Sequence, residues 1–241
     1  TPPALRQLLD AARQAHARGD HAQAGQLAVQ AVQMDTHCAE AHHLAGLACM
    51  ETRQLGRALE HLNRAAAIET ENAEYTTHFA QALAAAGRRG HALQVANIAY
   101  ALTPADPLTL DTLGGVYMQC NVHERAHALF RKAVALLPGD GRCRFKLALT
   151  STFTGDLARA EAQFDACIGL APHHWVAYGL RSRLRRQTAG DNHVDALRAL
   201  LAAHAGDLDA QIHLNGALGK EYEDLGDYAA SFEHLRRGKA A

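Results

Sequence analysis

The chain has 241 residues, with 24 Lys and Arg against 25 Asp and Glu, so its formal net charge is −1 at pH 7. This balance excludes a strong global field that would attract nucleic acid or an anionic bilayer, so partners must be recognised locally. Hydrophobic residues make up 48% but aromatic residues only 5%, which is typical of helices that pack closely through alanine.

The N-terminal segment TPPALRQLLDAARQ lacks the charged, apolar and cleavage regions of a signal peptide. No apolar run in the chain approaches the ~18–20 residues that span a bilayer, so we expect no membrane insertion. The five cysteines form no CxxC pair and their number is odd, which argues against a disulfide framework and a zinc ribbon. Reduced thiols and a cytoplasmic location are therefore expected.

A period of 34 residues organises most of the chain. Five segments align without a gap, at residues 5–38, 39–72, 73–106, 107–140 and 141–174. Apolar or small residues predominate at places 4, 7, 8 and 11, which is the spacing of one helical face; His42 and Arg144 are exceptions at place 4. A turn follows, and a second helix carries its own stripe at places 20, 24 and 27. In the fourth segment the two stripes are Leu110, Leu113, Gly114 and Tyr117, then Ala126, Phe130 and Ala133.

Each segment is therefore predicted to be a helix hairpin. Proline closes three of the segments, where one helix must stop before the next begins. The residues at place 8 and place 20 are small, as at Gly114 and Ala126, so the two helices of a hairpin can approach closely. A bulky substitution at either position is expected to overpack that contact.

This pattern resembles the tetratricopeptide repeat family over residues 5–174. The resemblance implies an all-α fold, a right-handed α-solenoid superhelix of antiparallel helix hairpins. It also implies that the first helix of each hairpin lines a concave groove that binds a peptide or a partner protein. A single hairpin buries too little surface to be stable alone, so neighbouring hairpins must stack into one continuous solenoid.

The register slips after residue 174. Residues 175–208 form a degenerate repeat that fits only with about three residues inserted around 188–192. Its packing faces are predicted to be Leu180 and Leu184, then Ala196, Leu200 and Ala203. Residues 209–241 form a final repeat, in which Ser231 and Gly238 replace two of the expected alanines.

The final repeat also resembles the last repeat of bacterial proteins in which a tetratricopeptide region precedes a sulfotransferase domain. The resemblance covers residues 217–235, with ALGK followed by ED, GDY and HL. It implies a partner-recruiting or substrate-recruiting region of a larger enzyme, and this chain itself carries neither a cofactor loop nor a catalytic base. The alternative is a stand-alone adaptor in secretion, pilus or envelope assembly.

Groove residues are expected at places 2, 5, 9 and 12 of each first helix, on a side distinct from the packing stripe. An apolar centre flanked by charge suits a peptide better than a small metabolite. The same positions also fit an exposed helix face without a ligand. The lysine and asparagine pattern that clamps a C-terminal carboxylate in some family members is missing. The predicted groove residues are Leu108, Asp111, Met118, Arg142, Phe145 and Leu149, with Lys146 and Phe153 adjacent to these places.

Four arginines lie within residues 181–186. Arg183 and Arg186 are expected to bind an acidic partner, because guanidinium groups pair planar anions in a bidentate way. The competing interpretation is a solvated helix face with only Leu180 and Leu184 turned inward.

The string HERAH, from His123 to His127, has the spelling of a zinc peptidase motif. The repeat frame puts His123 in the turn and gives Ala126 to the helix contact, so we expect no metal site there. No phosphate-binding loop and no serine elbow occur either. The prediction is a non-catalytic scaffold with no cofactor.

Overall fold

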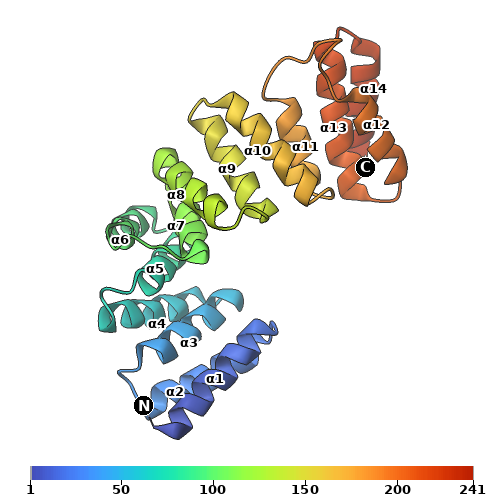
Figure 1. Cartoon of the computed structure of the whole chain (residues 1–241). Helices are drawn as coiled ribbons and strands as arrows, with labels where there is room; N and C mark the ends of the chain where they lie inside the picture. The colour runs from blue at the N-terminus through green and yellow to red at the C-terminus, as the bar shows by residue number, and fades with distance from the viewer. Residues whose placement is uncertain (1, 241) are drawn as a thin grey trace. The chain divides into compact units, whose positions relative to one another are not determined.

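The computed structural model describes residues 2–240, which form fourteen helices and no β-strand. The helices follow one another as antiparallel hairpins (Figure 1), which confirms the predicted all-α fold. By their contacts, residues 1–133 and residues 134–241 form two compact units, and the division falls inside helix α8. None of these helices combines the length and apolarity needed to cross a membrane.

The helices of the first unit begin where the repeat frame places them. Helices α3, α5 and α7 start at the first residue of their segments, and each second helix starts about 16 places later. The helices are α1 Pro3–Ala17, α2 His21–Met34, α3 Ala39–Glu51, α4 Leu55–Ile68, α5 Ala73–Ala85, α6 Arg89–Ala101 and α7 Pro107–Gln119, followed by α8 His123–Leu136.

The second unit has one regular hairpin and a less regular remainder. Helices α9 and α10 keep the 34-residue register, whereas α11 is short and a long loop separates it from α12. The helices are α9 Gly141–Phe153, α10 Leu157–Leu170, α11 Trp175–Ser182, α12 Val194–Ala203, α13 Leu208–Asp224 and α14 Tyr228–Ala240.

The turn inside each regular hairpin is set by place 15 of the repeat, which always has a positive φ. Glycine adopts this conformation without the steric cost that a side chain brings. The next amide then donates back to the carbonyl five residues earlier, as Asp20 N does to Ala15 O at 3.0 Å. The place-15 residues are Gly19, Arg53, Gly87, Asn121 and Gly155.

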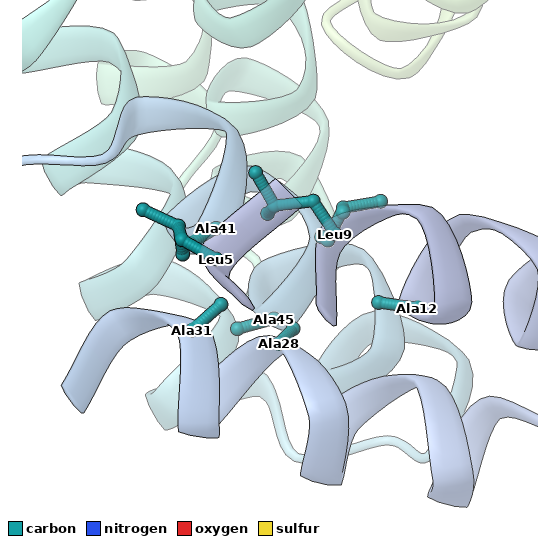
Figure 2. Close-up of a cluster of buried hydrophobic side chains, with 8 residues drawn as sticks. Leu5, Leu9, Ala12, Ala28, Ala31, Ala41 and Ala45 are labelled. Carbon is teal, nitrogen blue, oxygen red and sulfur yellow. The ribbon is translucent and has the colours of Figure 1, made fainter. Parts of the chain in front are cut away.

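Small residues let the two helices of a hairpin interlock. A Cβ added at Gly114 would lie 2.7 Å from Phe130 Cε1, and one added at Gly46 would lie 2.5 Å from Leu62 Cγ. The glycine at place 8 therefore makes room for the large residue at place 24. In the first repeat, where place 24 is alanine, place 8 is alanine too, and Ala12 and Ala28 share a buried cluster (Figure 2).

The degenerate repeat corrects one sequence prediction. Ala196 and Ala203 are exposed and Leu200 is half-buried, so the predicted stripe of α12 is wrong. The buried residues of α12 are Val194 and Leu197, which pack with Trp175 and α13. The stripe is displaced because the loop before α12 is held by α13 rather than by the regular turn of the repeat.

Candidate functional site

A crevice between α9 and the end of α11 is the strongest candidate for a binding site in the second unit. It has a volume of about 220 Å³. Phe153 is 59% exposed and Leu157 is 44% exposed, so apolar surface lies open to solvent there. Exposed apolar surface beside a charged residue is typical of peptide-binding sites. The residues that form this α9–α11 crevice include Leu149, Phe153, Leu157, Leu180, Leu184 and Arg183.

The crevice brings together three of the predicted groove residues. Leu149 and Phe153 are one turn apart on α9, which puts them on the same face. Arg183 is the C-cap of α11 and supplies the one charged side chain of a lining that is otherwise apolar except for Thr152. The lining also includes Leu180 and Leu184, which the sequence assigned to packing and which are half-buried against the core below.

Two of the four arginines of residues 181–186 are ion-paired within the second unit. Arg181 is 8% exposed and donates to Asp165 Oδ1 at 2.7 Å. Arg185 pairs with Glu161 at 2.9 Å and with Asp191 at 2.8 Å. The interpretation that only the two leucines turn inward is therefore wrong, because Arg181 is buried as well. Helix α11 ends at Ser182, so the arginines after it do not share a helical face.

The remaining predicted residues of α9 have different surroundings. Phe145 packs edge-on against Phe164, with ring centroids 5.8 Å apart, and lies 4.3 Å from the ring of His174. Lys146 is half-buried, and Arg142 is exposed with its guanidinium 3.7 Å from Asp140. Phe145 thus contributes to packing, and Arg142 lies at the solvent-exposed start of the helix.

Three predicted residues lie on α7 of the first unit. Leu108 is 61% exposed, whereas Asp111 and Met118 are half-buried. The buried face of α7 holds the predicted packing residues, including Leu113 and Tyr117. None of the three is among the residues that line the α9–α11 crevice. Arg186, the tenth predicted residue, is exposed in the loop that follows α11.

A buried carboxylate holds the loop between α11 and α12. Glu221 of α13 is fully buried and accepts hydrogen bonds from Ser182 Oγ at 2.6 Å, His193 N at 2.6 Å and His193 Nδ1 at 3.0 Å. Burial raises the pKa of Glu221, but these hydrogen bonds outweigh it and the net pKa is lowered. One turn later, Asp224 accepts from Gln187 N at 2.9 Å and pairs with Lys220. We call these contacts the α13 clasp.

The HERAH string is part of one helix. Helix α8 begins at His123, so the prediction that His123 lies in the turn is wrong by one position. Asn121 takes the left-handed conformation and Val122 N donates to Tyr117 O, which completes the turn before His123. Among residues 2–240, no third potential ligand joins His123 and His127 in a metal-binding group.

A different histidine cluster lies in the first unit. His43 of α3 and His78 of α5 are buried, and their ring nitrogens Nε2 and Nδ1 are 2.8 Å apart. Glu74 of α5 places Oε1 3.9 Å from the same nitrogen of His43. Burial, together with neighbouring histidines, lowers the pKa of His43 to about 3, and burial lowers that of His78 to about 4.

The comparisons with known proteins agree with this architecture. Residues 141–174 match the model of the tetratricopeptide repeat. PilF of Pseudomonas aeruginosa superposes with a TM-score of 0.68 at 19% identity, covering 86% of this chain and 95% of its own. The chain has a tetratricopeptide repeat fold.

Two further solved structures share the tetratricopeptide fold. PilW, described as a widely conserved type IV pilus biogenesis factor, has a TM-score of 0.66 at 16% identity and covers 100% of this chain and 94% of its own. YrrB, described as having an unusual peptide-binding site, has a TM-score of 0.58 at 16% identity and covers 87% of this chain and 97% of its own. No curated protein matches the chain.

The tetratricopeptide frame also shows what the sequence could have revealed about the histidines. His43 occupies place 5 of its repeat, and Glu74 and His78 occupy places 2 and 6 of the next one. Places 2 and 5 are predicted groove positions in neighbouring repeats. Place 5 predicts a groove position for His43, but this rule within one repeat does not pair it with Glu74 and His78, which lie 31 and 35 positions later.

Proposed function

We propose that this chain is a non-catalytic scaffold that binds a peptide or protein partner. The observation that carries the proposal is the α9–α11 crevice, an open and mainly apolar site with one cation in its lining. Apolar surface that is left open beside a charge provides both affinity and orientation for a partner side chain. The partner segment proposed here carries a large apolar residue close to a carboxylate, which Arg183 pairs.

The stand-alone adaptor is favoured over a recruiting region of a sulfotransferase. Support comes from the fold shared with PilF and with PilW, the pilus biogenesis factor. The sulfotransferase role depends on the resemblance of residues 217–235. Two residues of that string, Lys220 and Asp224, take part in the α13 clasp, so folding alone gives them a role.

The proposal is tested by selecting a phage-displayed library of random dodecapeptides on the immobilised full chain. Enriched peptides are then synthesised with a fluorophore, and their affinities are measured by polarisation. Peptides with an aromatic or aliphatic residue near Asp or Glu are expected. Phe153→Ser and Arg183→Glu should each weaken binding at least tenfold, since each removes one of the two recognition elements.

The matched control is Phe232→Ser on α14, where the original ring is 70% exposed and lies outside the crevice. This variant should bind the selected peptides as the parent chain does. Equal loss in Phe153→Ser and Phe232→Ser would show general stickiness of apolar surface and would refute the crevice as the site. Failure to enrich any peptide would refute peptide binding itself.

A further inference from the structure

We propose that His43, Glu74 and His78 bind one divalent transition-metal ion of the zinc class. One ligand atom from each residue lies within 4.8 Å of the other two. Two helices of neighbouring repeats supply them, with His43 on α3 and the other two on α5. Glu74 and His78 are four residues apart on α5, a spacing that puts both side chains on one helical face.

The spacing of these atoms suits a tetrahedral ion. Zinc binds histidine nitrogen at ~2.0–2.1 Å and carboxylate oxygen at ~2.0–2.2 Å, so neighbouring ligand atoms lie ~3.3 Å apart around it. The His43 nitrogen is 2.8 Å from the His78 nitrogen and 3.9 Å from the Glu74 oxygen. These two separations lie on either side of the tetrahedral value, so small rotations of the side chains would admit the ion.

The chemistry of the three donors also suits zinc. Two histidines and one glutamate form a donor set that zinc uses in proteins, with the fourth position left open. Both imidazoles are buried, at 5% and 8% exposure, and the ring of Tyr75 covers His43 at 4.4 Å between centroids. Burial disfavours the charged imidazolium, so each ring offers a lone pair at neutral pH.

Both imidazoles can bind the ion without a change in their protonation state. In the metal-free pair, one imidazole donates its N–H to the other. When both facing nitrogens, His43 Nε2 and His78 Nδ1, bind the ion, the donated proton moves to the remote nitrogen of the same ring. Each imidazole then stays neutral with one N–H, which is the form that binds metals.

The open position would face solvent on the side of Glu74. This carboxylate is half exposed and lines an open hollow of about 720 Å³ together with Asn72, Asp106 and Thr109. Asp106 is already engaged, because it accepts from Thr109 N at 2.7 Å and from Thr109 Oγ1 at 2.6 Å as the N-cap of α7. A water molecule or a ligand from a binding partner would therefore complete the coordination.

Another histidine pair provides an internal comparison. His42 and His61 place their Nδ1 atoms 3.1 Å apart, much like the proposed site. Among residues 2–240, however, this pair is not joined by a third potential ligand. A chain with 16 histidines offers many weak contacts for zinc, so the carboxylate is the feature that separates a built site from a chance pair.

The test is a zinc titration of the full chain after removal of metal with a chelator. Calorimetry should show one strong equivalent, and Co²⁺ should give the intense visible absorption of a four-coordinate ion. Glu74→Gln keeps the size of a half-exposed side chain and removes the anionic ligand, so it should weaken binding at least tenfold. His78→Asn should do the same, and circular dichroism checks that both variants remain folded.

The control is His61→Asn, which breaks the other histidine pair and should leave the strong equivalent unchanged. If His61→Asn lowers zinc affinity as much as Glu74→Gln does, binding is adventitious and the proposal is refuted. It is refuted too if Glu74→Gln binds like the parent chain, or if the parent chain shows no strong equivalent. If the chain binds no zinc but still binds the selected peptides, the metal proposal fails while the scaffold proposal stands.

Discussion

The interlocking of place 8 with place 24 makes a sharp prediction about two adjacent glycines of α7. A Cβ at Gly114 would lie 2.7 and 2.8 Å from two atoms of the buried Phe130 ring, whereas a Cβ at Gly115 would meet nothing within 4 Å. Both residues lie inside the same helix, so replacement by alanine gains the same helix propensity, about 1 kcal/mol. The two variants therefore differ only in the contact with Phe130.

Forcing an extra methyl group into a packed core costs roughly 1–3 kcal/mol. We expect Gly115→Ala to raise the free energy of unfolding by about 0.5–1 kcal/mol. Gly114→Ala should be less stable than Gly115→Ala by about 1–3 kcal/mol, because the clash is added to the same propensity gain. Urea unfolding followed by circular dichroism measures both variants against the parent chain.

The cause can be isolated with a double-mutant cycle. Phe130→Ala alone should cost about 3–5 kcal/mol, because the ring is fully buried. In that background Gly114→Ala should no longer destabilise, which gives a coupling energy of about 1–3 kcal/mol. If Gly114→Ala and Gly115→Ala prove equally stable, the helices are not in contact at Phe130 as described, and the reasoning fails.

The hairpin turns, the α13 clasp and the hydrogen bond between Trp175 and Asp207 can each be tested by one substitution. Arg53 has a φ of 59° at place 15, so Arg53→Gly should stabilise the chain by about 1 kcal/mol, measured as a higher urea midpoint; an unchanged midpoint would contradict it. The lowered pKa of Glu221 means that its stabilising contribution is present above pH ~4.5 and is lost as the pH falls through the folded pKa. Glu221→Gln should therefore destabilise at pH 7 and flatten the loss of stability as the pH falls below ~4.5, and a parallel acid profile would refute this. Asp207 accepts from the indole Nε1 of Trp175 at 3.0 Å and caps α13. Because Trp175 is the only tryptophan, Asp207→Ala should shift its fluorescence to the red, whereas Asp209→Ala should not.

The regular hairpins could be predicted from the sequence because their determinants are local. The stripes at places 4, 7, 8 and 11 and at places 20, 24 and 27 fix which face of each helix is buried, and Tyr117 and Phe130 are indeed fully buried. The left-handed residue at place 15 fixes where each hairpin turns. Both features depend on residues within one repeat, so periodicity alone reveals them.

The degenerate repeat could not be predicted in the same way because its determinants are distant in sequence. The loop before α12 is fixed by Glu221 and Asp224, and Ser182 and Glu221 are 39 positions apart. A helical period contains no information about such a contact, so it predicts the wrong buried residues in α12. In the final repeat, Ser231 occupies a position where the repeat pattern expects alanine. It is buried there, and its hydroxyl donates to Gly219 O at 2.7 Å.

The candidate sites follow the same division between local and distant determinants. Leu149 and Phe153 were predictable, because both lie on one face of α9. The position of Arg183 beside them depends on where α11 ends, and two of its neighbouring arginines are used in ion pairs within the unit. In the first unit, the stacking of successive repeats brings together residues that are distant in sequence. Stacking brings place 5 of one repeat close to places 2 and 6 of the next, so His43 faces Glu74 and His78 without any local motif. A search for metal ligands in a solenoid should therefore compare side chains one repeat apart. A motif within a single helix, such as HERAH, does not reveal such a site.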